Sequence, residues 1–330
     1  MLEIFISIVF MIIGLVLLIK GADFLIDGAA DFARWLKVPP IIIGLTIVAF
    51  GTSLPEFIVS LFATLQGKAD LSIGNIIGSN IVNIGLGIGL AAIFLPLVIH
   101  SKTLIYEMPF LLFSGFLLLI FSSNTFIFQE NTFSLDRIDG FMLLIIFLIF
   151  LYYIFKSIQN ERKRVKTEFR EKLKEELKEG NSLWKNIFLM SFGLLGLITG
   201  GKVFLRGAED AIFIFGVSQA FIGLTIAAIG TSLPEIITSI RGAMKGHGDI
   251  VIGNIMGSSI FNVFFVLGLT SLIKPIPINP SLLAIDGMVM IFITMAFLLF
   301  ATTNQVIKRW EGMCLTLIYL SYFAFLIWRL

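Results

Sequence analysis

The chain has 330 residues, of which 57% are hydrophobic and 14% are charged, and its formal net charge is +2. Soluble globular domains carry about 25% charged residues, so this composition excludes an ordinary soluble protein and gives no sign of a nucleic-acid partner. The single cysteine, Cys314, excludes an intramolecular disulfide and argues against a thiolate metal site. We therefore predict an all-α polytopic membrane protein that lies in a lipid bilayer.

Ten apolar stretches are long enough to cross about 30 Å of hydrocarbon. In chain order they cover residues 4–19, 41–65, 71–95, 105–121, 140–155, 184–203, 219–244, 250–273, 283–300 and 313–328. Gly, Pro, Ser, Thr and Asn interrupt the second, third, seventh and eighth stretches. Such interruptions are typical of discontinuous helices that line a transport site.

The basic residues separate by side of the membrane. If the N-terminus lies outside, only six of the 24 Lys and Arg residues fall outside, namely Lys68, Arg137, Lys202, Arg206, Lys274 and Arg329. The positive-inside rule therefore favours both termini outside. Residues 156–183 then form a charged cytoplasmic linker with Glu/Lys pairs at helical spacing. We interpret it as a solvated connector; a regulatory ligand site there is the alternative.

The two parts on either side of the linker share an internal repeat. Aligning residues 44–83 with 223–262 gives 23 identities in 40 positions without a gap, including an intact Gly-Thr-Ser-Leu-Pro-Glu in each part. We expect two five-helix repeats, at 1–155 with motif helices 41–65 and 71–95, and at 184–330 with motif helices 219–244 and 250–273. Because five is odd, the second repeat enters the membrane from the opposite side, and the two are inverted.

The motifs place oxygen donors on common helix faces. Thr52 and Ser53 lie four and three positions before Glu56, and Pro55 is expected to kink the helix and free carbonyls near Ala49. The second block adds Ser79 and Asn83, four positions apart. The equivalent set in the second repeat is Thr231, Ser232, Glu235, Ser258 and Asn262, with carbonyls near Ala228.

These donors are hard oxygens without His or Cys, which suits Na⁺, Ca²⁺ or Mg²⁺ better than zinc, copper or iron. Two carboxylates at membrane depth are too costly to remain ionised and unpaired. They are either protonated or balanced by about two positive charges, supplied by one Ca²⁺ or by two or more Na⁺. This equivalence allows the two ions to compete for one site, and a costly empty site favours exchange over leak.

The duplicated blocks resemble the alpha repeats of the calcium/cation antiporter superfamily, and in particular its prokaryotic sodium/calcium exchangers. The resemblance covers nearly the whole chain. It implies a Na⁺/Ca²⁺ antiporter with alternating access at mid-membrane. We expect the protein in the prokaryotic inner membrane, as a monomer and without a cofactor. The implied ion ligands are Ala49, Thr52, Ser53, Glu56, Ser79, Asn83, Ala228, Thr231, Ser232, Glu235 and Ser258. The symmetry of the repeat adds Asn262, which is equivalent to Asn83. The helices at 4–19 and 184–203 are implied to slide across the ion-binding core.

One residue departs from the family pattern. Many prokaryotic members and the potassium-dependent exchangers resemble this chain but have Asp where Asn262 stands, which lowers the case for K⁺ cotransport. Proton-coupled relatives characteristically carry a Glu where this chain has Gly78 and Gly257. A H⁺-coupled antiporter or an exchanger of another divalent cation remains the alternative. A passive channel fits less well, because a deep site with two charges would hold Ca²⁺ rather than pass it quickly. An intramembrane hydrolase fits less well, because it would lack a His or Lys base within the membrane.

Overall fold

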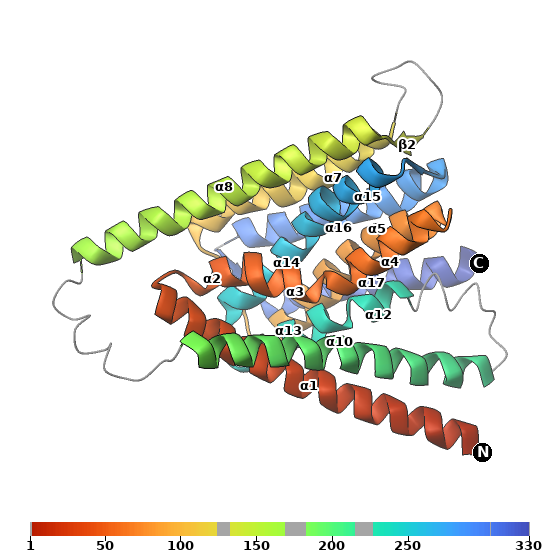
Figure 1. The fold of residues 1–330 in the computed structure, drawn as a ribbon, viewed down its shortest axis with the longest axis horizontal. Coiled ribbons are helices and arrows are strands. Elements are labelled where there is room, and N and C mark those ends of the chain that lie inside the picture. Colours follow the sequence, from red (N-terminus) through yellow and green to blue (C-terminus); the bar gives the residue numbers. More distant parts are fainter. Residues whose placement is uncertain (1, 124–132, 169–182, 215–226, 304, 330) are drawn as a thin grey trace.

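The computed structural model describes residues 2–123, 133–168, 183–214, 227–303 and 305–329, and these residues are mostly helical (Figure 1). The first half contains α1 (Leu2–Leu36), α2 (Pro40–Ile43), η1 (Gly44–Val48), α3 (Ala49–Thr52), α4 (Leu54–Leu65), α5 (Ala69–Val82), η2 (Asn83–Ile88), α6 (Gly89–Phe94), η3 (Thr103–Glu107), α7 (Met108–Ser122) and α8 (Arg137–Glu168). The second half contains α10 (Leu183–Ile214), α12 (Ala227–Thr231), α13 (Leu233–Met244), α14 (Gly248–Phe261), η5 (Asn262–Leu267), α15 (Gly268–Ile273), η6 (Leu282–Gly287), α16 (Met288–Thr302) and α17 (Arg309–Arg329). The η elements are π-helical turns.

Two small ladders tie the halves together at their ends. The strands are β1 (Leu97–Val98), β2 (Ser134–Leu135), β3 (Ile276–Pro277) and β4 (Val306–Ile307). β1 pairs with β4 and β2 pairs with β3, both antiparallel, so each ladder joins one strand of each half. β1 and β3 occupy equivalent positions after the second motif block of their halves.

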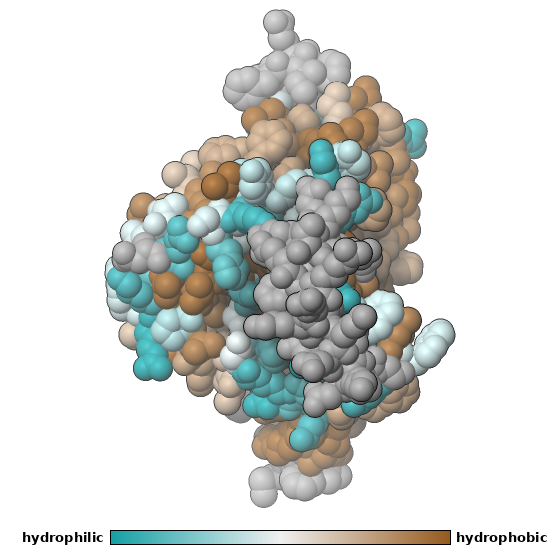
Figure 2. Space-filling model, turned by 90° about the vertical axis from the view of Figure 1, so that its left-hand side faces the viewer, coloured by the Kyte–Doolittle hydropathy of each residue, from teal (hydrophilic) through white to brown (hydrophobic). Residues whose placement is uncertain are grey.

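The helices that carry the second motif block form the centre of the bundle. In an 18-residue apolar stretch of each span, 94% of the residues are buried in Gly248–Ile273 and 78% in Ala69–Phe94, against 28% in Ile6–Leu36. In Figure 1, α8 lies along one flank and α1 and α10 lie together along the other. The outer helices therefore present the apolar surface that suits a bilayer, and the motif helices are shielded from it. Figure 2 shows the end of the bundle at which α8 ends and α10 begins, where hydrophilic residues gather and hydrophobic ones surround them.

The outer helices α1 and α10 pack backbone against backbone. A Cβ added to Gly193 would lie 2.5 Å from the backbone nitrogen of Leu25, and one added to Gly21 would lie 2.7 Å from that of Leu197. Only glycine permits this approach, which is the usual role of small residues between membrane helices. The two helices are antiparallel (Figure 1) and form one continuous pair.

The Gly-Thr-Ser-Leu-Pro-Glu motifs interrupt their helices at the serine. Pro55 lies in the first turn of α4 and Pro234 in that of α13, where a missing N–H is tolerated, and the preceding serines have non-helical ψ angles of 5° and 1°. The helices on either side of Ser53 are bent by 44°. Each motif therefore exposes a helix end inside the bundle, as the sequence predicts from proline.

Eight helices in the described residues are long and apolar enough to span a membrane, or nine if the bent pair around Ser53 is one span. The expected span at 219–244 begins outside the described residues. The first span is longer than expected: Ile6–Leu36 replaces 4–19, because Asp23 and Asp27 interrupt the hydropathy pattern but not the helix. α8 continues to Glu168, so the first part of the expected linker 156–183 is helical, and residues 169–182 lie outside the described residues.

The two ends of the bundle are distinct. The start of α1 and the end of α17 lie at one end in Figure 1, and the end of α8 and the start of α10 lie at the other. Both termini are therefore on the side opposite the charged linker, as the hydropathy pattern requires.

Candidate functional site

The two motif breaks face one another across the centre of the bundle. Ser53 ends α3 and Ser232 ends α12, and the helices that follow them begin with the turns that hold Glu56 and Glu235. α5 packs against α4 and α12, and α14 packs against η1, α3 and α13. The site is thus built where the second block of each half meets the first block of both halves.

Each glutamate is bonded to serines from both halves. The Oε1 atom of Glu56 accepts from Ser232 at 3.1 Å and from Ser79 at 3.5 Å. The Oε1 atom of Glu235 accepts from Ser53 at 3.1 Å and from Ser258 at 3.4 Å. The arrangement is the same in both directions, so the halves interlock through their acidic residues.

The second oxygen of each of these two carboxylates suits a cation site. Glu56 and Glu235 are fully buried, and their Oε2 atoms have no hydrogen-bond partner among the described residues. The Oδ1 atoms of Asn83 and Asn262 are also buried without such a partner. Buried unpartnered oxygens are rare in proteins, and four of them contributed by equivalent positions suit the binding of cations. In the described part of the chain, no group of three or more His, Cys, Asp and Glu offers an alternative metal site.

The hydroxyl and carbonyl donors lie beside the glutamates. The Oγ1 atom of Thr52 is 3.4 Å from the Oγ atom of Ser258, which also lies 3.4 Å from the carbonyl oxygen of Ala49. The kink does not free that carbonyl as expected: it accepts the backbone N–H of Ser53 at 3.0 Å, because the N–H that Pro55 lacks would bond to Gly51 instead. Ala228 occupies the equivalent place in α12.

The two site asparagines begin π-helical turns. η2 starts at Asn83 and η5 starts at Asn262, so the widened turn occupies the same place in both halves. Such turns are frequent at functional sites, because they redirect side chains from a regular helix. The Nδ2 atom of Asn262 donates to Asn80 at 3.1 Å. Among the expected residues, hydrogen bonds join Glu56 to Ser79 and Ser232, Glu235 to Ser53 and Ser258, and Ser258 to Thr52 and the carbonyl of Ala49. Asn262 is bonded to Asn80, outside the expected set, and the contacts that the structure describes do not join Asn83 or Ala228 to the others.

Three further asparagines belong to the site and were not expected as part of it. Asn75 accepts from Thr231 at 3.1 Å, and Asn254 accepts from Thr52 at 3.1 Å. Asn80 connects Asn262 to the backbone of Ser259. A signal was present in the sequence, because Asn75 and Asn254 are identical residues at equivalent positions of the repeat.

A cavity of about 280 Å³ approaches the site from the end of the bundle that holds the termini. Asp70, Asp286 and Arg329 contribute to its lining, and it reaches Gly78 and Val82, the residues that precede Ser79 and Asn83. The carboxylate of Asp286 accepts from Tyr322 at 2.9 Å and lies 3.7 Å from Arg329.

The equivalent surface of the other half is closed. A Cβ added to Gly74 would meet no described atom within 4 Å, whereas a Cβ on Gly253 would overlap the carbonyl oxygen of Ile41. A Cβ on Gly257 would lie 2.6 Å from the carbonyl oxygen of Leu45. The second motif block is therefore open at Gly74 in the first half and packed against backbone at Gly253 and Gly257 in the second half.

Comparison with known proteins gives a consistent result. The family model described as sodium/calcium exchanger protein matches residues 6–156 and 185–328. The chain is 38% identical over 320 residues to the putative antiporter CaxA of Alkalimonas amylolytica, covering 95% of this chain and 96% of that protein. It is 31% identical over 349 residues to the sodium/calcium exchanger MaX1 of Methanosarcina acetivorans, covering 96% and 97%.

Among solved structures, the chain is similar to the sodium-calcium exchanger NCX_Mj soaked with 2.5 mM Na⁺ and 10 mM Sr²⁺. The TM-score is 0.81 and the identity 31%, over 97% of this chain and 99% of that one. The likeness therefore extends over nearly the whole length of both chains.

Proposed function

This chain belongs to the sodium/calcium exchanger protein family, and we propose that it exchanges Na⁺ for Ca²⁺ across the membrane at the site between its two motif breaks. The observation that carries the proposal is that Glu56 and Glu235 each bind a serine of the other half and keep a second, buried oxygen without a partner among the described residues. This arrangement offers two charges and several neutral oxygens to a cation. It is the chemistry of a cation transporter.

The relatives support the choice of ions. One is named a sodium/calcium exchanger, and the structures of NCX_Mj were obtained with Na⁺, Ca²⁺ and Sr²⁺. In this chain, two carboxylates balance one divalent cation or two monovalent ones. Carboxylate, hydroxyl, amide and carbonyl oxygens together supply the six to eight ligands that Ca²⁺ prefers. We assign them to Ala49, Thr52, Ser53, Glu56, Ser79, Asn83, Ala228, Thr231, Ser232, Glu235, Ser258 and Asn262.

The proposed mechanism is alternating access by two inverted repeats. Residues 1–155 and 184–330 are the repeats, and the linker 156–183 joins them. With residues 219–244 as a further span, the chain has ten spans. The open surface at Gly74 and the packed surface at Gly253 support this view, because equivalent positions in inverted repeats exchange environments when the access side changes. An empty site with two uncompensated carboxylates is costly, which opposes return without an ion.

We place the protein in a prokaryotic inner membrane with both termini outside and the linker in the cytoplasm. The relative named inner membrane protein YrbG of Escherichia coli is 37% identical over 324 residues, and its name supports a location in the inner membrane. The orientation rests on the excess of basic residues at the linker end. The cavity at Asp70 and Asp286 then opens to the outside.

Competition between the two ions tests the proposal without a flux measurement. Purified protein in detergent should bind ⁴⁵Ca²⁺, and Na⁺ should displace it with a dependence steeper than first order, whereas choline should not. Displacement by acidification alone, with no effect of Na⁺, would favour the proton-coupled alternative. Absence of Ca²⁺ binding at any Na⁺ concentration would refute the assignment of the ion.

A further inference from the structure

Two buried asparagines outside the proposed ligand set form equivalent contacts in the two halves. The Nδ2 atom of Asn75 donates to the carbonyl oxygen of Glu56 at 3.2 Å and to the hydroxyl of Ser60 at 3.0 Å. Those two bonds fix the orientation of the amide, so its Oδ1 atom faces α12. There it accepts from the hydroxyl of Thr231 at 3.1 Å.

The second contact has the same form. The Oδ1 atom of Asn254 accepts from Thr52 at 3.1 Å, and the same hydroxyl lies 3.1 Å from the carbonyl oxygen of Val48 and 3.3 Å from that of Ala49. A hydroxyl has one proton and two lone pairs. When it coordinates a cation, its lone pairs must face the ion and its proton must go elsewhere. An acceptor on the far side of the hydroxyl therefore determines whether it is ready to bind.

We propose that Asn75 and Asn254 are positioning residues for cation binding: each accepts the proton of a threonine from the other half and so turns that threonine's lone pairs toward the ion. The proposal rests on the ligand roles of Thr52 and Thr231 given above. Asn75 is held by two bonds, whereas the Nδ2 atom of Asn254 has no partner among the described residues. Asn75 therefore makes the more rigid of the two contacts.

A double-mutant cycle tests this role. Asn75→Leu should raise the half-saturating Ca²⁺ concentration about three- to tenfold, which corresponds to one lost hydrogen bond. In a Thr231→Val background the same substitution should change it less than about twofold, because the hydroxyl that Asn75 orients is gone. Asn80→Leu, in the same helix and equally buried but bonded to Asn262, is the matched control and should remain additive with Thr231→Val.

The outcomes separate this proposal from the proposed function. If wild type exchanges Na⁺ for Ca²⁺ and the Asn75→Leu effect is additive with Thr231→Val, the positioning role is wrong and the exchanger stands. If wild type shows no exchange, the proposed function is wrong. Asn75→Leu protein that is monodisperse and unchanged in half-saturating Ca²⁺ would also overturn the role.

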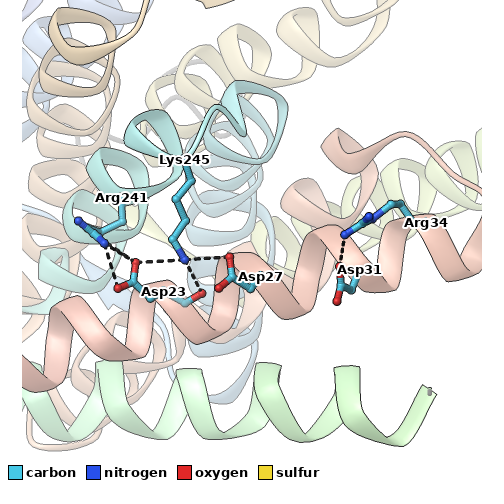
Figure 3. Close-up of polar contacts among 6 residues, drawn as sticks. All are labelled: Asp23, Asp27, Asp31, Arg34, Arg241 and Lys245. Carbon is cyan, nitrogen blue, oxygen red and sulfur yellow. Dashed lines mark hydrogen bonds and ion pairs between the residues drawn. The ribbon is translucent and has the colours of Figure 1, made fainter. Parts of the chain in front are cut away.

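A separate observation concerns the contact between the outer helix α1 and α13 (Figure 3). The guanidinium of Arg241 donates to both carboxylate oxygens of Asp23, at 2.9 and 3.0 Å. The ammonium of Lys245 lies 2.8 Å from Asp27 and 3.2 Å from Asp23. These four residues, which we term the α1–α13 cluster, are partly exposed, and Asp23 and Asp27 lie on the linker half of α1.

The equivalent positions of the other repeat cannot form this cluster. With the same offset of 179 residues, Asp23 and Asp27 correspond to Lys202 and Arg206, and Arg241 and Lys245 correspond to Phe62 and Gln66. Helix α10 carries the basic residues, but Phe62 and Gln66 offer no acid to receive them. Accordingly α1 packs along α13, whereas α10 packs mainly on α1 and on α3, α12 and α13.

We infer that the α1–α13 cluster is a latch that favours the conformation open at the Asp70 end. If the inverted repeats exchange conformations, as proposed above, the contact of α1 with α13 is replaced by that of α10 with α4. The cluster is then broken and no ion pair takes its place. The broken symmetry therefore biases the equilibrium toward the state described here, in which the cavity near Gly78 is open.

Thiol labelling of the cavity tests the latch. In a Cys314→Ser background, Phe323→Cys introduces a thiol in the cavity lining, and an impermeant maleimide should label it. Arg241→Gln combined with Lys245→Gln should slow labelling about two- to fivefold, consistent with ion pairs that are partly solvated. Arg34→Gln is the matched control, because Arg34 pairs only with Asp31 of its own helix in Figure 3 and should leave the rate unchanged.

Two further variants make the test independent of folding losses. Exchanging the charges with Asp23→Arg and Arg241→Asp together should restore the labelling rate. Gln66→Glu supplies an acid directly after α4, at the position equivalent to Lys245, and should slow labelling because it can pair with Arg206 in the other conformation. An unchanged rate in Arg241→Gln plus Lys245→Gln, or an equal change in Arg34→Gln, would overturn the latch.

Discussion

Replacing either central glutamate by glutamine should separate ion binding from folding. Glu235→Gln keeps the shape of the side chain and an oxygen for the hydroxyl of Ser53 at 3.1 Å, but removes one of the two charges. With an effective dielectric constant of about 20, a carboxylate about 4 Å from a cation attracts a divalent ion by about 8 kcal/mol and a monovalent ion by about 4 kcal/mol. Desolvation offsets part of both, but the divalent ion always loses more.

We therefore expect Glu235→Gln and Glu56→Gln to weaken Ca²⁺ binding at least hundredfold and Na⁺ binding less. Each variant buries one unpaired amide, which costs about 1–3 kcal/mol, but it no longer buries a charge. The two effects offset each other, so the fold should persist. The assay is ⁴⁵Ca²⁺ binding to monodisperse protein, with thermal unfolding as the measure of folding. Glu107→Gln is the control, because Glu107 is a buried membrane acid that lies outside the motifs and is bonded to Tyr153 at 2.8 Å. Unchanged Ca²⁺ affinity in either folded site variant would refute the two-carboxylate reasoning.

Three other predictions concern orientation, ion dependence and packing. In intact cells, a cysteine at Ser157 should be shielded from an impermeant thiol reagent and one at Gln129, which lies outside the described residues, should label; the reverse pattern would show that the bundle is inserted the other way. Exchange should proceed without K⁺, because Asn262 supplies no third carboxylate, and a strict K⁺ requirement would show that this residue was misinterpreted. Gly253→Ala should lower the melting temperature by more than about 3 °C, because its Cβ would overlap the carbonyl of Ile41. The Cβ of Gly74→Ala would meet no described atom within 4 Å, so this variant should change the melting temperature by less than about 1 °C, and it should slow exchange. Equal stability of the two glycine variants would argue against the difference in packing.

Much of the site could be predicted because the repeat samples the same chemistry twice. The repeat and its prolines predict two interrupted helices with a serine and a glutamate at each break. The bonds of Glu56 to Ser232 and of Glu235 to Ser53 are seen only in the structure. Duplication turned an ambiguous polar helix into a specific site. Spacing along one helix, however, relates only residues of the same motif.

The contacts of Asn75 and Asn254 were missed because they join the two halves. Asn75 and Asn254 are unremarkable on their own helices, and their role depends on the threonines of the other half. The length of α1 was underestimated because Asp23 and Asp27 lower hydropathy, and only the structure shows that Arg241 and Lys245 neutralise them. The open surface at Gly74 and the closed one at Gly253 belong to identical residues, so no sequence pattern distinguishes them.

Ca²⁺ uptake driven by a sodium gradient tests the central claim most directly. Proteoliposomes loaded with Na⁺ and placed in a sodium-free bath should accumulate ⁴⁵Ca²⁺, and the uptake should stop when the gradient is collapsed and respond to membrane voltage if several Na⁺ replace one Ca²⁺. Vesicles loaded with choline, without a proton gradient, should take up none. Equal uptake with choline inside would contradict coupling and indicate a channel, and full replacement of Na⁺ by a pH gradient would show that protons, rather than Na⁺, are exchanged for Ca²⁺.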